Sequence, residues 1–257
     1  MLKRERHGGT ELLVIEREHR GNAMSSELST AFAETLTDLE GDGGLRAVVI
    51  TGAGDKFFCA GGDIKAYGAI QDREALDETF DRTRAVLDTI EALPVPVIAA
   101  VNGYALGGGG ELLLACDLRL AAPHARIGFP QSRLGIIPAW HGIERLIRDC
   151  GPRLAMRLAM TGEQLDPEAA KAFGLIDEIV DGRPVLDAAL EQAAAFDTVA
   201  PLALAAVKRI GRTAAAEGLE AARRVSREET ARLWFTADHR EAEAAFAEKR
   251  PPKFRGA

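Results

Sequence analysis

Four consecutive glycines, 107–110, stand between two apolar runs and are followed at once by Glu111. The run before them, 95–101, has the length of a buried strand, and 112–115 after them continues as a helix. A strand, a glycine turn and a helix leave unpaired N–H groups that a ligand's oxygen can approach closely. Glu111 could then move a proton beside a stabilised oxyanion. The alternative is a turn that only packs a helix against a sheet.

Strand and helix signals alternate along the chain as far as about Gly182. One helix is predicted over 25–39, with a serine cap and a regular apolar stripe, and another over 73–93, ended by Pro94. The predicted strands are 11–16, 46–51, 97–101, 118–121 and 126–129. This alternation indicates right-handed β–α–β units and the α/β class, in which active sites lie where strands end and helices begin.

The composition changes after Gly182, where the chain becomes rich in Ala, Glu, Arg and Leu. About three helices are predicted over 184–249, the longest over 218–249, and we expect their apolar stripes to pack on the core or on another subunit. The expected organisation is a core over 1–195 that holds the site and a helical region over 196–257 that serves oligomerisation.

Composition excludes several classes of function. The net charge of −7, from 32 basic and 39 acidic residues in 257, leaves no basic surplus for nucleic acid. Three cysteines without a CxxC pair and five histidines without HExxH clustering predict reduced thiols and no metal. Neither a signal segment nor an apolar run of ~18 residues is present, so we expect no membrane span and a cytoplasmic location.

Two further segments have the character of functional loops. The loop 56–65 is rich in glycine and also follows a strand, so the two loops together could direct two N–H groups at one carbonyl oxygen. Within it, Cys59 is interpreted as a small packing residue. The segment 127–142 runs from a strand end through turns to a helix near His141, and it places Trp140 and His141 on a loop.

Taken together, these segments resemble the crotonase superfamily, also called the enoyl-CoA hydratase/isomerase family. The resemblance spans essentially the whole chain, and several independent motifs occur in the family's order. The matching segments are 58–64, 101–111, 134–138, Arg145-Leu146, Thr161-Gly162, 174–177 and the tail around Asp238, Glu241, Phe246 and 248–250.

The resemblance implies a spiral of ββα units with a helical C-terminal region, assembled as a homotrimer or a dimer of trimers. The substrate would be an acyl-CoA thioester, and no separate cofactor is expected because coenzyme A is part of the substrate. The N–H groups of Ala60 and Gly108 would hold the thioester oxygen, and Glu111 would be the main acid/base. Substrate and CoA contacts are expected from Arg20, Ala23, Ala60, Gly61, Asp63, Ile64, Lys65, Gly107, Gly108, Trp140, Phe246 and Lys249.

One position departs from the family pattern. Hydratases of the family use a second glutamate, which here is Gln131, in the segment Gly128-Phe129-Pro130-Gln131. Glutamine cannot exchange a proton near neutral pH. Family isomerases with a single carboxylate typically keep this second one, so its loss also counts against a simple isomerase. Ala139 stands where some relatives place an aspartate, which disfavours the dehalogenase and ring-closing branches.

Three interpretations remain. The chain could be an enoyl-CoA hydratase-type enzyme that works with Glu111 alone, slowed by ~10²–10⁴-fold or helped by His141, because histidine side chains titrate near neutral pH. It could be a malonyl-type acyl-CoA decarboxylase acting on methylmalonyl- or ethylmalonyl-CoA, with Trp140 and His141 in its pocket. It could also be a non-catalytic acyl-CoA-binding subunit. The acyl group and the metabolic pathway, fatty-acid oxidation included, are not specified by these residues.

Overall fold

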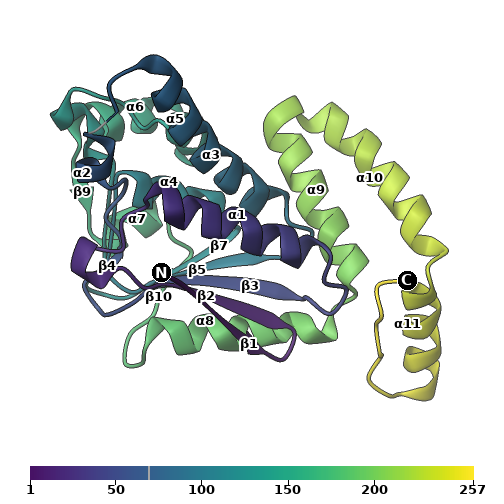
Figure 1. The fold of residues 1–257 in the computed structure, drawn as a ribbon. Helices are drawn as coiled ribbons and strands as arrows, with labels where there is room; N and C mark the ends of the chain where they lie inside the picture. Colours follow the sequence, from purple (N-terminus) through teal and green to yellow (C-terminus); the bar gives the residue numbers. More distant parts are fainter. Residues whose placement is uncertain (69) are drawn as a thin grey trace.

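The computed structural model describes residues 1–68 and 70–257, which form two sheets surrounded by helices (Figure 1). The first sheet has the spatial order β1 (Leu2–His7), β2 (Thr10–Ile15), β3 (Ala47–Gly52), β5 (Val97–Val101), β7 (Leu118–Ala121) and β10 (Glu178–Ile179). All of its neighbours are parallel except β1 and β2. In this register Ala100 of β5 pairs with Thr51 of β3 on one side and Leu120 of β7 on the other.

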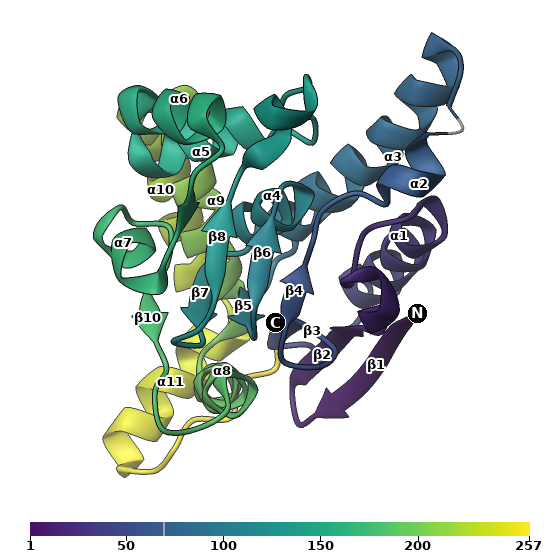
Figure 2. The same ribbon diagram turned by 90° about the vertical axis from the view of Figure 1, so that its left-hand side faces the viewer.

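A second, smaller sheet contains β4 (Phe57–Cys59), β6 (Tyr104–Leu106), β8 (Arg126–Gly128) and β9 (Gln164–Leu165). Each of β3, β5 and β7 is followed along the chain by a strand of this second sheet and then by helical segments. The result is the spiral of ββα units that the resemblance implies. Figure 2 shows β4, β6 and β8 side by side, with α4 (Gly108–Ala115) starting beyond β6.

Helices cover both faces of the first sheet. On one face α1 (Ser26–Glu40) and α3 (Arg73–Ala92) pack over alternate strand residues such as Val48 and Ile50. On the other face α8 (Val185–Ala194) packs over Ala47 and Val49 (Figure 1). The two-residue period of the strands explains why neighbouring residues of β3 belong to different cores.

The predicted helix over 25–39 is confirmed as α1. Ser25 is its N-cap and accepts a hydrogen bond from Leu28 N at 3.3 Å. The stripe of Leu28, Phe32, Leu36 and Leu39 is buried. The helix over 73–93 and the five predicted strands also match observed elements to within a residue or so.

The remaining helices lie in the second half of the chain, apart from two short ones in the first. The short segments are α2 (Ile64–Tyr67) and the 3₁₀ helices η1 (Glu18–Arg20), η2 (Pro130–Leu134) and η3 (Ala195–Thr198). The longer ones are α5 (Gly142–Cys150), α6 (Pro152–Thr161), α7 (Pro167–Ala172), α9 (Pro201–Glu217), α10 (Leu219–Trp234) and α11 (Ala237–Glu248). Within 1–68 and 70–257, no single helix has the length and apolarity to cross a membrane; Val185–Thr198 and Pro201–Glu217 pass only together, across a 113° bend.

One sequence expectation needs correction, and one strand has no counterpart among the predictions. The single helix expected over 218–249 is two helices, because Thr236 caps a new one by accepting a hydrogen bond from His239 N at 3.2 Å. The edge strand β1 is not predicted, because its side chains are mostly charged. Its pairing depends instead on partners such as Glu11, which accepts from Arg4 Nε at 2.7 Å.

The glycine turn is held by a close backbone contact. A Cβ added to Gly109 of α4 would lie 1.8 Å from the Cys59 carbonyl oxygen of β4. Cys59 itself is fully buried, and burial raises the pKa of its thiol to about 11, in agreement with the packing role expected for it.

We predict that Gly109→Ala destabilises the fold by about 3 kcal/mol or more, because the added methyl group meets backbone that cannot rotate away. The matched control is Gly211→Ala in α9, where an added Cβ meets nothing within 4 Å. That change should stabilise the chain by up to ~1 kcal/mol through helix propensity. Urea unfolding followed by circular dichroism measures both. Equal stability of the two variants would contradict the packing argument.

Candidate active site

Glu111 lies in the first turn of α4 and is 2% exposed. Its Oε1 accepts a hydrogen bond from Gln131 Nε2 at 2.9 Å, and its Oε2 accepts one from the backbone N–H of Trp140 at 2.7 Å. The carboxylate is therefore held between η2 and the segment that leads into α5. The side-chain partner is the residue that replaces the expected second glutamate.

Burial raises the pKa of Glu111 to about 7. Backbone N–H groups of Trp140, Ala139 and Gly142 act in the opposite direction, as does the charge of Arg145, but they do not cancel the cost of desolvation. A carboxyl group that titrates near neutral pH can both accept and return a proton, as acid–base catalysis requires.

Two residues that line the same cavity as Glu111, Gly62 and Gly108, have backbone N–H groups without a partner in the described part of the chain. Gly108 is the first residue of α4, so its N–H has no partner within the helix. Met24 bonds to both neighbours of Gly62, accepting from Asp63 N at 2.8 Å and donating to Gly61 O at 2.7 Å. The N–H of Gly62 itself therefore points to the opposite side. Neither N–H has an acceptor within the described residues.

The expectation for Ala60 is wrong, because its N–H donates to the carbonyl oxygen of Gly21 at 2.9 Å. Ala60 still lines the cavity, and Gly62 replaces it as the free donor of the loop. Glycine at position 61 brings the two loops together: its φ is +106°, and a Cβ there would lie 3.1 Å from Gly108 N. The sequence motif could not separate Ala60 from Gly62, because hydrogen bonding to a distant loop decided between them.

The cavity between the two loops has a volume of about 210 Å³. Its walls are largely apolar. Tyr67 lies over Gly62 and Trp140 lies over Gly108, at positions where an added Cβ would come within 2.3 Å and 2.0 Å of the rings. Phe80 stands beside Tyr67, with ring centroids 5.4 Å apart. Tyr67 is a lining residue that no sequence motif identified.

Other predicted contacts surround the cavity without all lining it. Among the predicted contacts, the cavity is lined by Gly61, Ile64, Gly107 and Trp140. It is not lined by Arg20, Ala23, Asp63 or Lys65. Asp63 caps α2 and pairs with Arg17 at 2.9 Å, a contact across 46 positions that the sequence does not reveal. This ion pair lowers the pKa of Asp63 and fixes the loop that carries Gly62.

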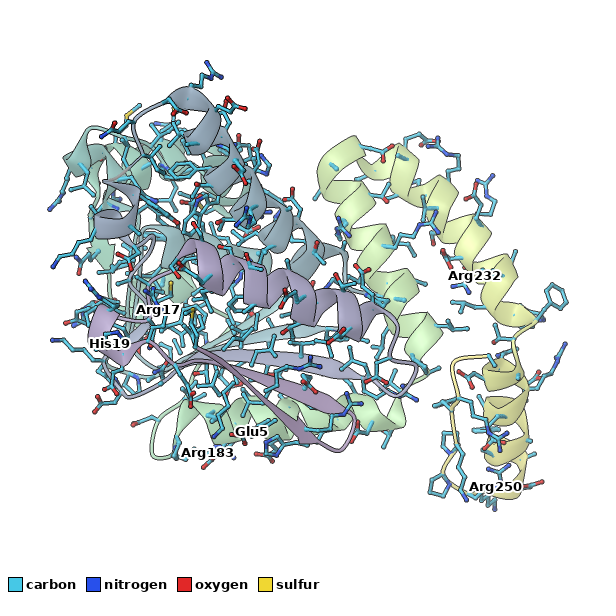
Figure 3. The ribbon with its side chains drawn as sticks, in the orientation of Figure 1. Glu5, Arg17, His19, Arg183, Arg232 and Arg250 are labelled. Carbon is cyan, nitrogen blue, oxygen red and sulfur yellow. The ribbon has the colours of Figure 1, made fainter. Side chains whose placement is uncertain are left out.

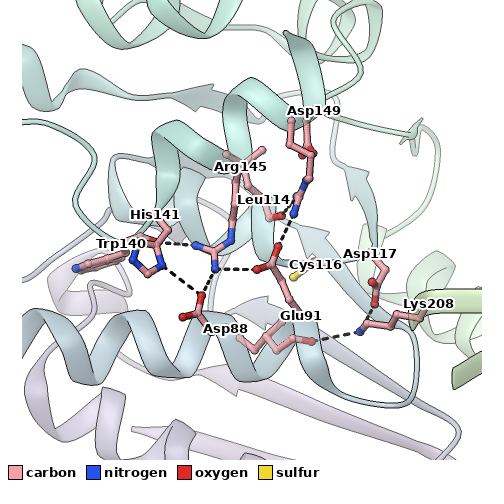
Figure 4. A network of polar contacts seen from close by, with 12 residues as sticks. Asp88, Glu91, Leu114, Cys116, Asp117, Trp140, His141, Arg145, Asp149 and Lys208 are labelled. Atoms are coloured by element: carbon pink, nitrogen blue, oxygen red, sulfur yellow. Dashed lines mark hydrogen bonds and ion pairs between the residues drawn. The ribbon is translucent and has the colours of Figure 1, made fainter. Parts of the chain in front are cut away.

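His141 points away from the cavity, contrary to its expected role as a helper in proton transfer. Its Nδ1 lies 3.4 Å from Asp88 Oδ1, and its side chain lines a different hollow (Figure 4). The reason is its backbone: φ is +62° at this N-cap of α5, so the chain turns the ring outward after Trp140.

Phe246 and Lys249 belong to the end of α11 and do not line the cavity. Figure 3 shows neighbouring Arg250 at the opposite side of the molecule from Arg17. Phe246 is 88% exposed. Their expected contact with a neighbouring subunit stays a prediction. Over the described residues, no three His, Cys, Asp or Glu side chains are grouped as a metal site would require.

Comparison with known proteins supports the family resemblance independently of the motifs. The chain is 38% identical over 260 residues to a carnitinyl-CoA dehydratase of Salmonella arizonae, covering 99% of this chain and 98% of the relative. A carnitinyl-CoA dehydratase of Proteus mirabilis is 35% identical over 253 residues, with 96% of each chain covered.

Solved structures agree with the sequence relatives. The crystal structure of an enoyl-CoA hydratase from Bacillus anthracis superposes with a TM-score of 0.95 at 32% identity, covering 100% of this chain and 99% of that one. An enoyl-CoA hydratase from Mycobacterium smegmatis gives a TM-score of 0.92 at 30% identity, with 98% of each chain covered. The sequence profile described as Enoyl-CoA hydratase/isomerase matches residues 5–257. The chain therefore belongs to the enoyl-CoA hydratase/isomerase family, the crotonase superfamily that its motifs resemble.

Proposed function

We propose that this protein is an enoyl-CoA hydratase-type enzyme that interconverts a 2-enoyl-CoA and a 3-hydroxyacyl-CoA through an enolate. One observation carries the proposal: a buried carboxyl group with a pKa of about 7, Glu111, shares a cavity with the free N–H groups of Gly62 and Gly108. A thioester oxygen held by both N–H groups would gain ~3–4 kcal/mol of transition-state stabilisation from each well-placed donor.

The chemistry balances with one carboxylate. In hydration, water adds its oxygen to C3 of the enoyl group while Glu111 takes a proton from that water. The electron pair of the double bond moves to the thioester oxygen as an enolate. Glu111 then returns the proton to C2, which restores both the thioester and the carboxylate. Dehydration is the same path reversed, with hydroxide leaving C3 as water.

Gln131 fits this scheme as a group that orients rather than transfers. Its Nε2 donates to Glu111, while its buried Oε1 has no hydrogen-bond partner within the described residues. A water molecule or a 3-hydroxyl group beside Glu111 is a suitable donor to Oε1. Since an unsatisfied buried acceptor costs ~1–3 kcal/mol, the site favours substrates that supply such a donor.

The cavity also suggests which acyl groups to test. Its volume of about 210 Å³ suits a short chain. The relatives above are named for a carnitinyl group, which is a 3-hydroxyacyl chain that ends in a quaternary ammonium. The aromatic rings of Tyr67, Phe80 and Trp140 at the cavity offer the π-faces that bind such cations. Crotonyl-CoA and carnitinyl-CoA are therefore the first two substrates to compare.

Malonyl-type decarboxylation is the second candidate. It is favoured by one observation, the apolar wall that includes Leu134 and Ile137, against which a substrate carboxylate would lose hydration. Carbon dioxide release from methylmalonyl-CoA and ethylmalonyl-CoA measures it. Release from these substrates, without hydration of crotonyl-CoA, would replace the first proposal by the second; thioester binding without turnover would favour a binding subunit.

Large apolar side chains are exposed on and between the C-terminal helices α10 and α11, and they concern how subunits assemble. Trp234, Phe235 and Phe246 expose 55%, 76% and 88% of their surface. Exposed apolar side chains of this size on neighbouring helices are typical of an interface. They support the proposed homotrimer, or dimer of trimers.

We predict that Glu111→Gln lowers the hydration rate by at least ~10²-fold and up to ~10⁴-fold, because the amide can neither take nor return a proton. The assay follows the loss of the conjugated-thioester absorbance of crotonyl-CoA. Glu144→Gln, the same substitution at an exposed position of α5, is the control and should keep wild-type activity. Full activity of the Glu111 variant would overturn the role assigned to this residue.

The pH dependence follows from the raised pKa of Glu111. The carboxylate is the active form in both directions, so kcat/KM should rise as Glu111 loses its proton, with a midpoint near pH 7. Above that midpoint the activity should level off. Initial rates between pH 5.5 and 9 measure the profile, and a flat profile across this range would exclude Glu111 as the titrating base.

Substitutions at Gln131 test its orienting role. Gln131→Glu should raise hydration, because it supplies a second proton-exchanging group in contact with Glu111, whereas Gln131→Met keeps the volume and removes both polar atoms. We expect the Met variant to lose about tenfold or more in kcat/KM, from one or two lost hydrogen bonds. Equal rates for all three forms would show that the position plays no part in the reaction.

A further inference from the structure

The buried residue Arg145 connects the surface of the molecule to the site without reaching the cavity. It lies in α5, is 4% exposed, and its side chain folds back over the N-terminus of its own helix. Its Nη1 donates to the carbonyl oxygen of Trp140 at 2.5 Å. Its Nη2 donates to Asp88 at 2.7 Å and to Glu91 at 2.9 Å, both on α3 (Figure 4).

Trp140 is the link between this guanidinium and Glu111. Its carbonyl oxygen accepts from Arg145, while its N–H donates to Glu111 Oε2 at 2.7 Å. The next residue, His141, has a φ of +62°, a left-handed conformation that costs free energy outside glycine. Gly142 then lies directly against the carboxyl group, where an added Cβ would be 2.4 Å from Oε2.

We propose that Arg145 is a positioning residue, which holds the turn 140–142 in the conformation that keeps the Trp140 N–H on the Glu111 carboxylate. The inference rests on the proposed function in that Glu111 is the acid/base. Without the guanidinium, no side chain holds the carbonyl oxygen of Trp140, which directly precedes the left-handed residue His141. The turn is then free to relax away from Glu111.

Charge alone does not explain this arrangement. The guanidinium bridges three acceptors from two segments, and a lysine ammonium, a single point donor, cannot reproduce that planar fork. The titratable and charged groups around it are Asp88 and Glu91 on α3, His141 at the start of α5, and Arg148 one turn further on. Arg148 pairs with the same Glu91 at 2.5 Å and donates to the carbonyl oxygen of Leu114 at 2.9 Å; within the described residues it forms no hydrogen bond with Trp140.

This neighbour supplies the matched control. The test compares Arg145→Lys and Arg145→Gln with Arg148→Gln in the full-length protein. In both Arg145 variants we expect kcat to fall roughly tenfold to a hundredfold with little change in KM, because the acid/base is misplaced and the substrate contacts remain. The midpoint of the pH profile should rise by about half a unit or more, because the carboxylate loses N–H donors. Arg148→Gln should leave both unchanged.

A second readout does not depend on turnover. The protonation of Glu111 can be followed by infrared difference spectroscopy of its carboxyl band, assigned with the Glu111→Gln variant. A raised midpoint in Arg145→Lys, which keeps the positive charge, supports positioning, even if the enzyme turns out to hydrate none of the substrates tested. A wild-type midpoint and a wild-type kcat in a folded Arg145→Lys would overturn the inference. If Arg145→Gln does not fold, the Lys variant alone decides.

Discussion

The site depends on how closely two backbones approach each other. The first turn of α4 lies so near to β4 that Gly109 leaves no room for a methyl group beside the Cys59 carbonyl, and Gly61 lies against the N–H of Gly108. Only glycine permits this contact. It directs the N-terminus of a short helix and a neighbouring loop at the same cavity, and Glu111, three residues into that helix, comes with them. The remaining helices and strands hold α4 and the loop after β4 in this contact.

Much of the fold follows from local patterns. Apolar runs of strand length and one capped, striped helix predict β3, β5 and α1, because each buries a regular face whose period is visible in the sequence. The exceptions have local causes as well. The charged strand β1 is stabilised by cross-strand partners rather than by burial, and a threonine cap at position 236 divides what reads as one C-terminal helix.

The site was only partly predictable. Glu111 and Gly108 are marked by the glycine turn itself, since the start of a helix leaves its first N–H groups unpaired and Glu111 lies in that first turn. Ala60 and His141 could not be judged in the same way. Whether the N–H of Ala60 is free depends on the carbonyl of Gly21, and where His141 points depends on a left-handed residue in a turn. The first is a contact between segments far apart in the sequence, and the second is a left-handed conformation at a non-glycine residue, so no local pattern encodes either.

The raised pKa of Glu111 also affects the stability of the whole chain. An unfolded glutamate titrates near 4.5, whereas this one keeps its proton to about pH 7. Between these values the folded state binds more protons than the unfolded state, so the free energy of unfolding falls as the pH rises. Above neutral pH the ionised carboxylate therefore costs the fold about 3 kcal/mol. The ionised form of Glu111, which the site needs as a base, is therefore the form that lowers the free energy of unfolding, so the group that equips the site for catalysis also weakens the fold.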